Sequence, residues 1–458
     1  MQKSIIACLI FSLFISCTEK NKAVNNEKLI RLVTLDPGHF HAALVQKTSY
    51  PQVDSTVSVY APEGNDLKWH LDRIDKYNSR KESPTHWNEN VYVGNDFFQK
   101  MIAEKKGNVV VLAGNNKKKT EYILKSLQNG FNVLADKPMV IDGNGFEQLK
   151  EAFETAEKNK LLLYDIMTER YEITTLLQRE LSLIAEIFGE MEKGTPENPA
   201  ITKESVHHFY KYVSGDVLTR PAWFLDPTQQ GEGIVDVMTH LVDLVQWECF
   251  PNQVIDYSRD ININSAKRWT TDLSLDDFKT ITKLDTFPSF LNANKIDKVL
   301  HVFSNGEINY SIRGVHAKTS VIWKYKAAEG TGDTHYSTMR GTKANIIIRQ
   351  GAEENYKPVL YIEPVATDIN YESALFEKVK IIQTKYPGVE LERTKAGWKV
   401  IIPEQYKEGH EAHFARVTEK FLEYIEKGNL PSWEVPNMLA KYYVTTKALA
   451  MAIKGDNH

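Results

Sequence analysis

The chain has 458 residues, of which 42% are apolar and 25% are charged, so it can bury the cores of two or more globular domains. Its formal net charge is -4 at pH 7. Without long basic runs, this near balance excludes the electrostatic footprint of a nucleic-acid-binding protein.

The N-terminus predicts a secreted lipoprotein. Lys3 precedes an apolar run at residues 5–15, which is too short to span a bilayer and is typical of a secretory signal. Ser16-Cys17 resembles a bacterial lipobox, in which the cysteine is lipidated and becomes the new N-terminus. We expect residues 1–17 to be the signal peptide, with an uncleaved anchor as the alternative, and residues 18–28 to be a flexible tether. The chain is then lipid-anchored in the cell envelope and faces the periplasm or the outer membrane.

Cysteine use predicts stability from packing alone. Of the 3 cysteines, Cys8 leaves with the signal and Cys17 carries the lipid. Cys249 then remains alone, so no internal disulfide is expected.

The chain from residue 29 onward shows the opening of a nucleotide-binding βαβ unit. An apolar run at residues 29–34 predicts a strand, and a tight turn and a helix with small residues follow it. The glycine fingerprint of such units is damaged, because Asp36 and His41 hold the outer positions if Gly38 is the middle glycine. Side chains at those positions crowd the turn, so the turn alone does not establish cofactor binding.

His39 and His41 alternate in a way that metal ligands can. The sequence offers no fixed partner cluster beside them, so we expect no metal. Contacts to substrate or phosphate, or packing at the helix start, are the preferred interpretations. After the second strand, expected at residues 57–60, Glu63 is the nearest acid that could bind a ribose diol.

Two further strands lead to a candidate substrate contact. Residues 108–113 predict a buried parallel strand, and Asn115-Asn116 follow at its carboxyl end, where ligands of α/β sheets bind. The next strand, at residues 131–135, delivers Asp136-Lys137-Pro138. A lysine at this point is well placed to hydrogen-bond a substrate hydroxyl in the crevice. An exposed loop lysine is the alternative.

A glycine-rich segment supplies acid–base groups. Gly231-Glu232-Gly233 opens a run of apolar residues at helical spacing, which predicts a helix with Asp236 and His240 on one face. A carboxylate can fix the tautomer of an imidazole, and the imidazole can give or take a proton. A solvated surface pair is the alternative.

These motifs together resemble the glucose-fructose oxidoreductase, inositol dehydrogenase and MocA family, written Gfo/Idh/MocA. Asp136-Lys137-Pro138 resembles its E-K-P motif, and residues 231–240 resemble its G-G-G-x-x-x-D-x-x-x-H segment. The resemblance implies an α/β fold with an N-terminal Rossmann domain, a doubly wound parallel sheet, at residues 29–160. It also implies a substrate domain at residues 161–408, which is α+β with a large open, mainly antiparallel sheet.

The resemblance further implies NAD or NADP and a set of site residues. The residues expected at the cofactor are Asp36, Gly38, His39, Phe40, His41, Asn115, Asn116, Asp136 and Lys137. Lys137, Asp236 and His240 are implied to converge on the substrate as catalytic residues. Arg170-Tyr171 matches an arginine-aromatic pair that follows E-K-P in many members, and both residues are expected to bind the substrate. The chain departs from the family in its missing glycines, in Asp136 for Glu, and in Lys119 or Thr120 where a histidine is often found.

Further substrate contacts are expected in the second domain. Residues 205–211 alternate like a sheet strand, so His208 and Tyr210 would share a face toward the pocket. Arg220 and Trp223 supply a planar donor and an aromatic plate that suit a sugar ring, with buried packing as the alternative for Trp223.

The remainder predicts the antiparallel sheet and a helical end. Asn305-Gly306 lies between two β-compatible runs, which predicts a hairpin turn, and strands are expected at residues 315–325, 344–349 and 359–362. In the last segment, residues 409–458, two amphipathic helices are expected to pack back on the core.

These features predict an NAD(P)-dependent oxidoreductase that acts on a CH–OH group of a sugar, glycoside or polyol. Lys137 would orient the hydroxyl and His240, steered by Asp236, would accept its proton. Because a plain secretory signal separates the chain from cytoplasmic NAD, a tightly bound cofactor is expected. The alternatives are a redox-neutral NAD-dependent glycosidase and a non-catalytic sugar-binding lipoprotein. We expect a homo-oligomer with a carbohydrate or polyol substrate, no nucleic-acid partner, and membrane contact only through the lipid anchor.

Overall fold

A computed structural model of the whole chain describes residues 29–213, 216–329, 331–365 and 370–456. The expected signal peptide, tether and lipidation site at Cys17 lie outside the described residues. Within the described residues, no helix has both the length and the apolar character needed to cross a membrane.

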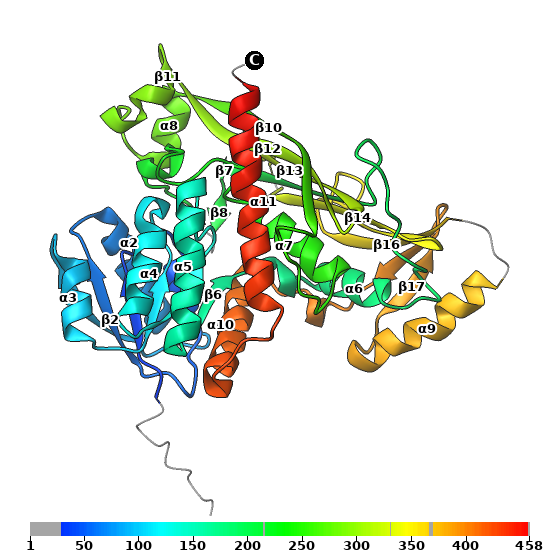
Figure 1. Cartoon of the computed structure of the whole chain (residues 1–458), viewed down its shortest axis with the longest axis horizontal. Helices are drawn as coiled ribbons and strands as arrows, with labels where there is room; N and C mark the ends of the chain where they lie inside the picture. The colour runs from blue at the N-terminus through cyan, green and yellow to red at the C-terminus, as the bar shows by residue number, and fades with distance from the viewer. Residues whose placement is uncertain (1–28, 214–215, 330, 366–369, 457–458) are drawn as a thin grey trace, which may run out of the picture.

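The N-terminal unit is built on a six-stranded parallel sheet, drawn in blue and cyan in Figure 1. The strand order β3-β2-β1-β4-β5-β6 is doubly wound, and it places the carboxyl ends of β1 and β4 at the point where the order reverses. Continuous apolar runs form the central strands because helices cover both faces. The strands are β1 (Leu32–Leu35), β2 (Thr56–Ala61), β3 (Asn88–Val93), β4 (Val109–Leu112), β5 (Asn132–Asp136) and β6 (Leu163–Ile166).

The expected Rossmann domain is therefore confirmed, with one difference at its end. β6 pairs in parallel with β5, so the first sheet extends past the boundary that we placed at residue 160. The connecting helices are α1 (His41–Val45), α2 (Asn65–Ser79), α3 (Phe97–Glu104), α4 (Lys119–Gln128) and α5 (Gly143–Asn159). The short helix η2 (Asn116–Lys118) precedes α4, and the short helix η3 (Thr168–Tyr171) follows β6.

The second unit is a ten-stranded, mainly antiparallel sheet, as expected. Its order is β10-β12-β13-β7-β14-β15-β16-β18-β17, with β11 paired to β12, and only the β7–β13 pair among these is parallel. The strands are β7 (Ile201–Tyr210), β10 (Ile261–Ser274), β11 (Lys295–Ile296), β12 (Val299–Ile312), β13 (Val315–Lys326), β14 (Thr334–Arg340), β15 (Ala344–Arg349), β16 (Val359–Pro364), β17 (Glu390–Arg393) and β18 (Trp398–Ile401). A separate two-stranded ribbon joins β8 (Tyr212–Val213) to β9 (Asp216–Val217).

The expected hairpin turn at Asn305-Gly306 is wrong. β12 runs through both residues, and the chain reverses at Arg313-Gly314 instead. The Asn305 side chain accepts a hydrogen bond from the main-chain N–H of Trp323 at 2.6 Å, and it is buried in the sheet. The asparagine thus bonds the neighbouring strand rather than forming a turn.

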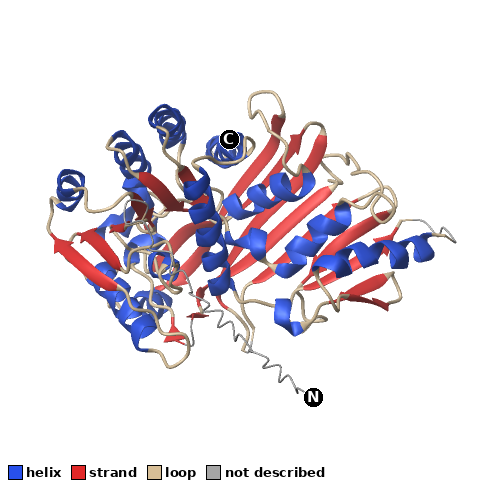
Figure 2. Ribbon diagram, turned by 90° about the horizontal axis from the view of Figure 1, so that it is seen from below, coloured by secondary structure: helices blue, strands red, loops and turns tan. Residues whose placement is uncertain are grey.

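Helices lie across one face of the second sheet (Figure 2). They are α6 (Ile173–Ser182), α7 (Met238–Cys249) and α9 (Tyr371–Lys385), while α8 (Leu275–Thr282) and the short helices η4 (Ala222–Leu225), η5 (Ser289–Asn294) and η6 (Glu404–Tyr406) occupy connections. Leu241, Val242 and Val245 of α7 join the apolar core beneath the sheet.

Two C-terminal helices pack back on the core, as expected. α10 (His410–Lys427) contributes Phe414 and Phe421 to the core of the Rossmann unit. α11 (Glu434–Gly455), drawn in red in Figure 1, contributes Tyr442 to that core and Val444 to the core of the second unit.

Candidate functional site

Lys137 and Asp236 meet at the boundary between the two sheets. Lys137 follows the carboxyl end of β5, and Asp236 lies in the loop before α7. The Lys137 Nζ donates to Asp236 Oδ1 at 2.6 Å, with side chains only 9% and 6% exposed. The structure thus brings together two of the three expected catalytic residues, while their catalytic roles stay predictions.

A glycine fixes the loop that carries Asp236. A Cβ atom on Gly233 would lie 1.9 Å from the main-chain oxygen of Ser304, so only glycine allows the loop to press against β12. The Gly233 N–H donates to the carbonyl of Phe303 at 3.0 Å. Asp236 is therefore held by the second sheet, and Lys137 by the first.

His240 lines the same cavity but is not hydrogen-bonded to Asp236. α7 begins at Met238, after Asp236, so the expected Asp236–His240 pair on one helical face is wrong. Within the described residues, the buried His240 Nδ1 has no hydrogen-bond partner. Burial, and then the positive charge of Lys137, lowers the pKa of His240 well below its ordinary value. The imidazole is thus neutral near pH 7 and can accept a proton.

These residues open into a cavity of about 670 Å³ between the two units. Of the 13 histidines in the chain, six line it: His39, His41, His207, His240, His335 and His410. Charged groups of both signs also line the cavity: Lys137, Lys211, Glu169, Glu172, Asp236 and Asp333. A cavity with this many donors and acceptors suits a small polar ligand that carries several hydroxyl groups.

Asp333 organises the far wall of the cavity. Its carboxylate contacts the Nδ1 atoms of His207 and His208, both at 3.1 Å, and accepts a hydrogen bond from Lys211 Nζ at 2.7 Å. His207 lines the cavity, whereas His208 and Tyr210 are not among its lining residues. The expected orientation of β7, with His208 and Tyr210 toward the pocket, is therefore wrong.

Arg170 and Tyr171 also lie away from the cavity, so their expected substrate role is corrected. Arg170 is buried, and its guanidinium donates to Asp243 at 2.6 and 2.8 Å and to Glu434 at 3.0 Å. Tyr171 packs against the core of the Rossmann unit. Arg170 thus joins α7 to α11, and its positive charge is paired with the two carboxylates of Asp243 and Glu434.

Of the expected sugar contacts near the glycines, only Arg220 lines the cavity. The Arg220 guanidinium lies 4.3 Å from the ring centroid of Phe224, and its Nε donates to the carbonyl of Phe209. Trp223 instead donates from Nε1 to Asp66 Oδ2 at 2.8 Å. Its indole covers the turn after β1.

That turn is where a dinucleotide would bind in a Rossmann unit, and its surroundings are occupied by this chain's own groups. A Cβ on Gly38 would lie 3.0 Å from Trp223 Cζ2, so the indole rests directly on the turn. The His39 N–H, one of the donors that a pyrophosphate would need, donates to the carbonyl of Ala113 at 3.1 Å.

The loop after β4 is also occupied by contacts within the chain. Asn115 Nδ2 donates to Gln229 Oε1 at 2.7 Å, and the main-chain N–H of Asn116 donates to the carbonyl of Gln229 at 2.9 Å.

The turn after β1 also carries acidic groups. Burial and the nearby Asp66 carboxylate raise the pKa of Asp36, at the turn, to about 6. The carboxyl groups of Asp36 and Asp66 lie beside the turn where a pyrophosphate would bind, and they repel an anionic ligand. The residues in this arrangement therefore do not fit a dinucleotide. Glu63, the expected ribose contact, is exposed, and Asp66 takes the place beside the turn.

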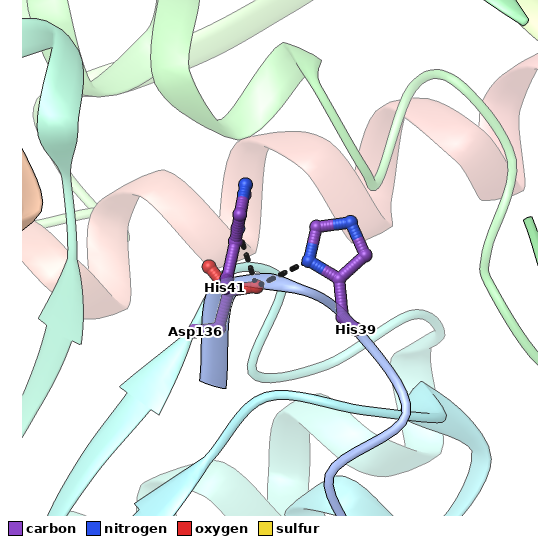
Figure 3. Close-up of side chains that lie close together, drawn as sticks. All are labelled: His39, His41 and Asp136. Carbon is purple, nitrogen blue, oxygen red and sulfur yellow. Dashed lines mark hydrogen bonds and ion pairs between the residues drawn. The ribbon is translucent and has the colours of Figure 1, made fainter. Parts of the chain in front are cut away.

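A second group of expected cofactor residues forms a compact cluster. His41 Nδ1 lies 2.9 Å and His39 Nδ1 lies 3.4 Å from the same oxygen, Oδ2, of Asp136 (Figure 3). One ligand atom from each of these side chains lies within 4.8 Å of the others, so the partner that we did not find beside His39 and His41 in the sequence is Asp136. The signal that sequence reasoning missed is that β5 delivers Asp136 beside the turn after β1.

Comparison with known proteins identifies both units. Residues 39–165 match the family described as "Oxidoreductase family, NAD-binding Rossmann fold", named GFO_IDH_MocA, and residues 177–453 match "Putative oxidoreductase C terminal domain". A search of curated proteins found no match.

Solved structures agree with these matches. A crystal structure of a "putative oxidoreductase" from Parabacteroides merdae is 57% identical, covers 93% of this chain and 98% of its own, and has a TM-score of 0.92. A levoglucosan dehydrogenase in complex with NADH and levoglucosan is 10% identical, with 93% and 97% coverage and a TM-score of 0.59. A 3-ketoreductase from Actinomadura kijaniata in complex with NADP and TDP-benzene is 14% identical, with 92% and 98% coverage and a TM-score of 0.57.

The last two likenesses show the fold alone. The family matches cover most of the chain, and the Parabacteroides merdae structure shares more than half of its residues with it. The chain therefore belongs to the Gfo/Idh/MocA oxidoreductase family.

Proposed function

We propose that this chain is an enzyme that acts on a hydroxyl group of a carbohydrate or polyol, and that Lys137, Asp236 and His240 bind that hydroxyl and move its proton. The observation that carries the proposal is the Lys137–Asp236 bond of 2.6 Å, made across the two units inside the cavity that His240 lines. Levoglucosan in the complex of one structural neighbour is a small polyhydroxylated ligand of the kind that the polar cavity suits.

The roles follow from charge and hydrogen bonding. The Lys137 ammonium can donate to the substrate oxygen and stabilise negative charge that develops on it. Asp236 holds that ammonium in place and can accept from a second hydroxyl, since a carboxylate has several acceptor positions. His240 is neutral because of burial, so it supplies the proton acceptor.

Hydride transfer to NAD or NADP is the finer expectation for this family, and it meets an obstacle in this chain. Trp223 and Gln229 would have to leave the crevice before a dinucleotide could enter. The proposal is therefore restricted to hydroxyl binding and proton transfer. The same obstacle applies to a redox-neutral glycosidase that recycles bound NAD.

A non-catalytic carbohydrate-binding protein is the second candidate, and the covered turn is the observation that favours it. Both candidates predict binding of a sugar in the cavity. Only the enzyme is expected to convert the bound sugar into a product.

The test is a ligand and product screen of the purified full-length protein. Aldoses, ketoses, glycosides, anhydrosugars and polyols are titrated by calorimetry, and each bound compound is then followed by NMR for conversion, both alone and with NAD or NADP added as hydride acceptor. We expect Lys137→Met to weaken binding at least about tenfold, because a charge-assisted hydrogen bond contributes roughly 1.5–3 kcal/mol. His240→Asn is expected to keep binding and lose turnover.

Glu82→Gln, an exposed substitution outside the cavity lining, is the control. Binding without conversion in the wild type would favour the non-catalytic candidate. Full binding and turnover in Lys137→Met would remove the proposed centre.

A further inference from the structure

The cluster of His39, His41 and Asp136 has an arrangement that hydrogen bonding alone leaves unsatisfied. Both imidazole Nδ1 atoms face Oδ2 of Asp136, at 3.4 and 2.9 Å, while Oδ1 of the same carboxylate is buried with no partner within the described residues. The Nδ1 of His39 is likewise buried and makes no hydrogen bond there. Two orphaned polar atoms in one buried cluster indicate a missing partner.

The two distances from imidazole nitrogen to carboxylate oxygen suit a cation as that partner. A transition metal lies about 2.1 Å from imidazole nitrogen and carboxylate oxygen, which places neighbouring ligand atoms about 3.0–3.4 Å apart. The observed separations of 2.9 and 3.4 Å fall at these limits. Figure 3 shows both rings turned toward the one oxygen.

The surrounding charges leave this carboxylate available. Lys119 Nζ donates to the main-chain oxygen of Asp136 at 3.1 Å, and Lys137 Nζ is bonded to Asp236 at 2.6 Å. No hydrogen bond joins either ammonium to the Asp136 carboxylate in the part of the chain that the structure describes. The two ammonium groups reduce the affinity for a cation, so the site needs the negative charge of Asp136 to bind one.

The donor set and its position define the class of ligand. Two imidazoles and one carboxylate, with the remaining positions open, are typical of catalytic zinc and of non-haem iron sites. His39 and His41 line the cavity, so the open positions would face its interior. Asp136 is 3% exposed and lies behind them.

We infer that His39, His41 and Asp136 bind a divalent first-row transition metal, which takes the place that the covered turn denies to a dinucleotide. The metal's open positions receive an oxygen of the ligand in the cavity, next to Lys137. If the proposed function holds, that oxygen belongs to the sugar or polyol, and the metal polarises it as a Lewis acid. Metal binding itself does not depend on the proposed function.

The test uses the full-length protein, stripped with a chelator and titrated with Zn²⁺ by calorimetry and with Co²⁺ by visible absorption. We expect one equivalent of metal per chain, with absorption bands of Co²⁺ bound to nitrogen and oxygen. Affinity should fall at least roughly ten- to hundredfold in His39→Asn and in Asp136→Asn. His335→Asn, which changes another cavity histidine outside the cluster, should bind as the wild type does. Circular dichroism confirms the fold of each variant, and His39→Asn, the more exposed position, keeps the test valid if Asp136→Asn does not fold.

Absence of saturable binding by the folded wild type would overturn the inference, as would unchanged affinity in both cluster variants. Stoichiometric NAD(H) in the purified protein, without metal, would overturn it as well. Lys137→Met separates the two proposals: its failure to affect sugar binding counts against the proposed function, whereas its Zn²⁺ affinity is expected to be at least that of the wild type, because one nearby positive charge is removed.

Discussion

The Lys137–Asp236 pair shows how individual residues of the site depend on each other. Both side chains are almost fully buried, so each charge is stable only because the other is present. The sequence predicted that both would converge on the site, but it paired Asp236 with His240. The error arises because helical spacing says nothing about where the first turn begins, and the contact of Gly233 with β12 delays that turn to Met238.

Removal of one member of this pair should destabilise the protein more than removal of both. We expect Lys137→Met to cost about 3 kcal/mol, because it leaves a buried carboxylate unpaired, and the Lys137→Met/Asp236→Asn double variant to recover much of that loss. Urea denaturation of the four members of the cycle measures the coupling. The Lys203–Glu248 pair, which is 0% exposed and outside the cavity lining, is the matched control. Additive losses at Lys137 and Asp236 would contradict the expected coupling.

Glu89 predicts a dependence of stability on pH that is separate from the site. Burial raises its pKa from 4.5 to about 7. Between these values the unfolded chain has lost the proton of Glu89 and the folded chain keeps it, so the contribution of Glu89 to stability is complete below pH 4.5 and is lost as the pH rises through 7. Between pH 5 and 8 the wild type should therefore lose about 2–3 kcal/mol more stability than Glu89→Gln. Urea midpoints from pH 5 to 8 measure it, with the exposed Glu82→Gln as control, and parallel curves for wild type and Glu89→Gln would refute it.

At the scale of elements, the pattern of apolar and polar residues predicted correctly which segments form strands. It was less successful in predicting which side chains of a strand face the cavity. β7 was expected from its alternation, yet the alternation of buried and less buried residues shifts at His207 and His208. The pairing of β7 with β13 is nevertheless continuous from Ile201 to His208, and it is the face of Ser205 and His207, opposite to that of His208, that lines the cavity. Asn305-Gly306 failed as a turn for a related reason: local turn preference was overridden by pairing of β12 with both of its neighbours.

The η4 segment covers the turn after β1, and its removal should expose the dinucleotide crevice. We expect the wild type to show no saturable NADH fluorescence change, and the Trp223→Ala/Asp36→Gly variant to bind NADH measurably. The double change removes the indole over Gly38 and one carboxyl group, and glycine suits position 36, where φ is 47°. Trp269→Ala, at a tryptophan that is 40% exposed, is the control. Tight NADH binding by the wild type would contradict the closed crevice.

For the whole molecule, two motifs were enough to predict both domains and their order. The motifs lie at the carboxyl edge of the first sheet and beneath the second, which is the arrangement that the family resemblance implied. The sequence could not predict Asp333 or His410 in the cavity, because each comes from a distant segment that carries no local signal of function. Such residues become neighbours only through the pairing of β14 in the second sheet and the packing of α10 against the Rossmann unit.

The single helix α11 has a mechanical consequence for this cavity. Tyr442 on one side of the helix and Val444 on another belong to different hydrophobic cores, and Lys441, next to Tyr442, contacts Asp165 of β6 at 2.5 Å and Asp243 of α7 at 2.9 Å. A rod anchored in both bodies resists hinge opening, because bending would pull a buried ammonium away from one of its two carboxylates. We therefore expect ligands to enter the cleft through side-chain and loop movements, while the two units are held together by a helix that lines no part of the cavity.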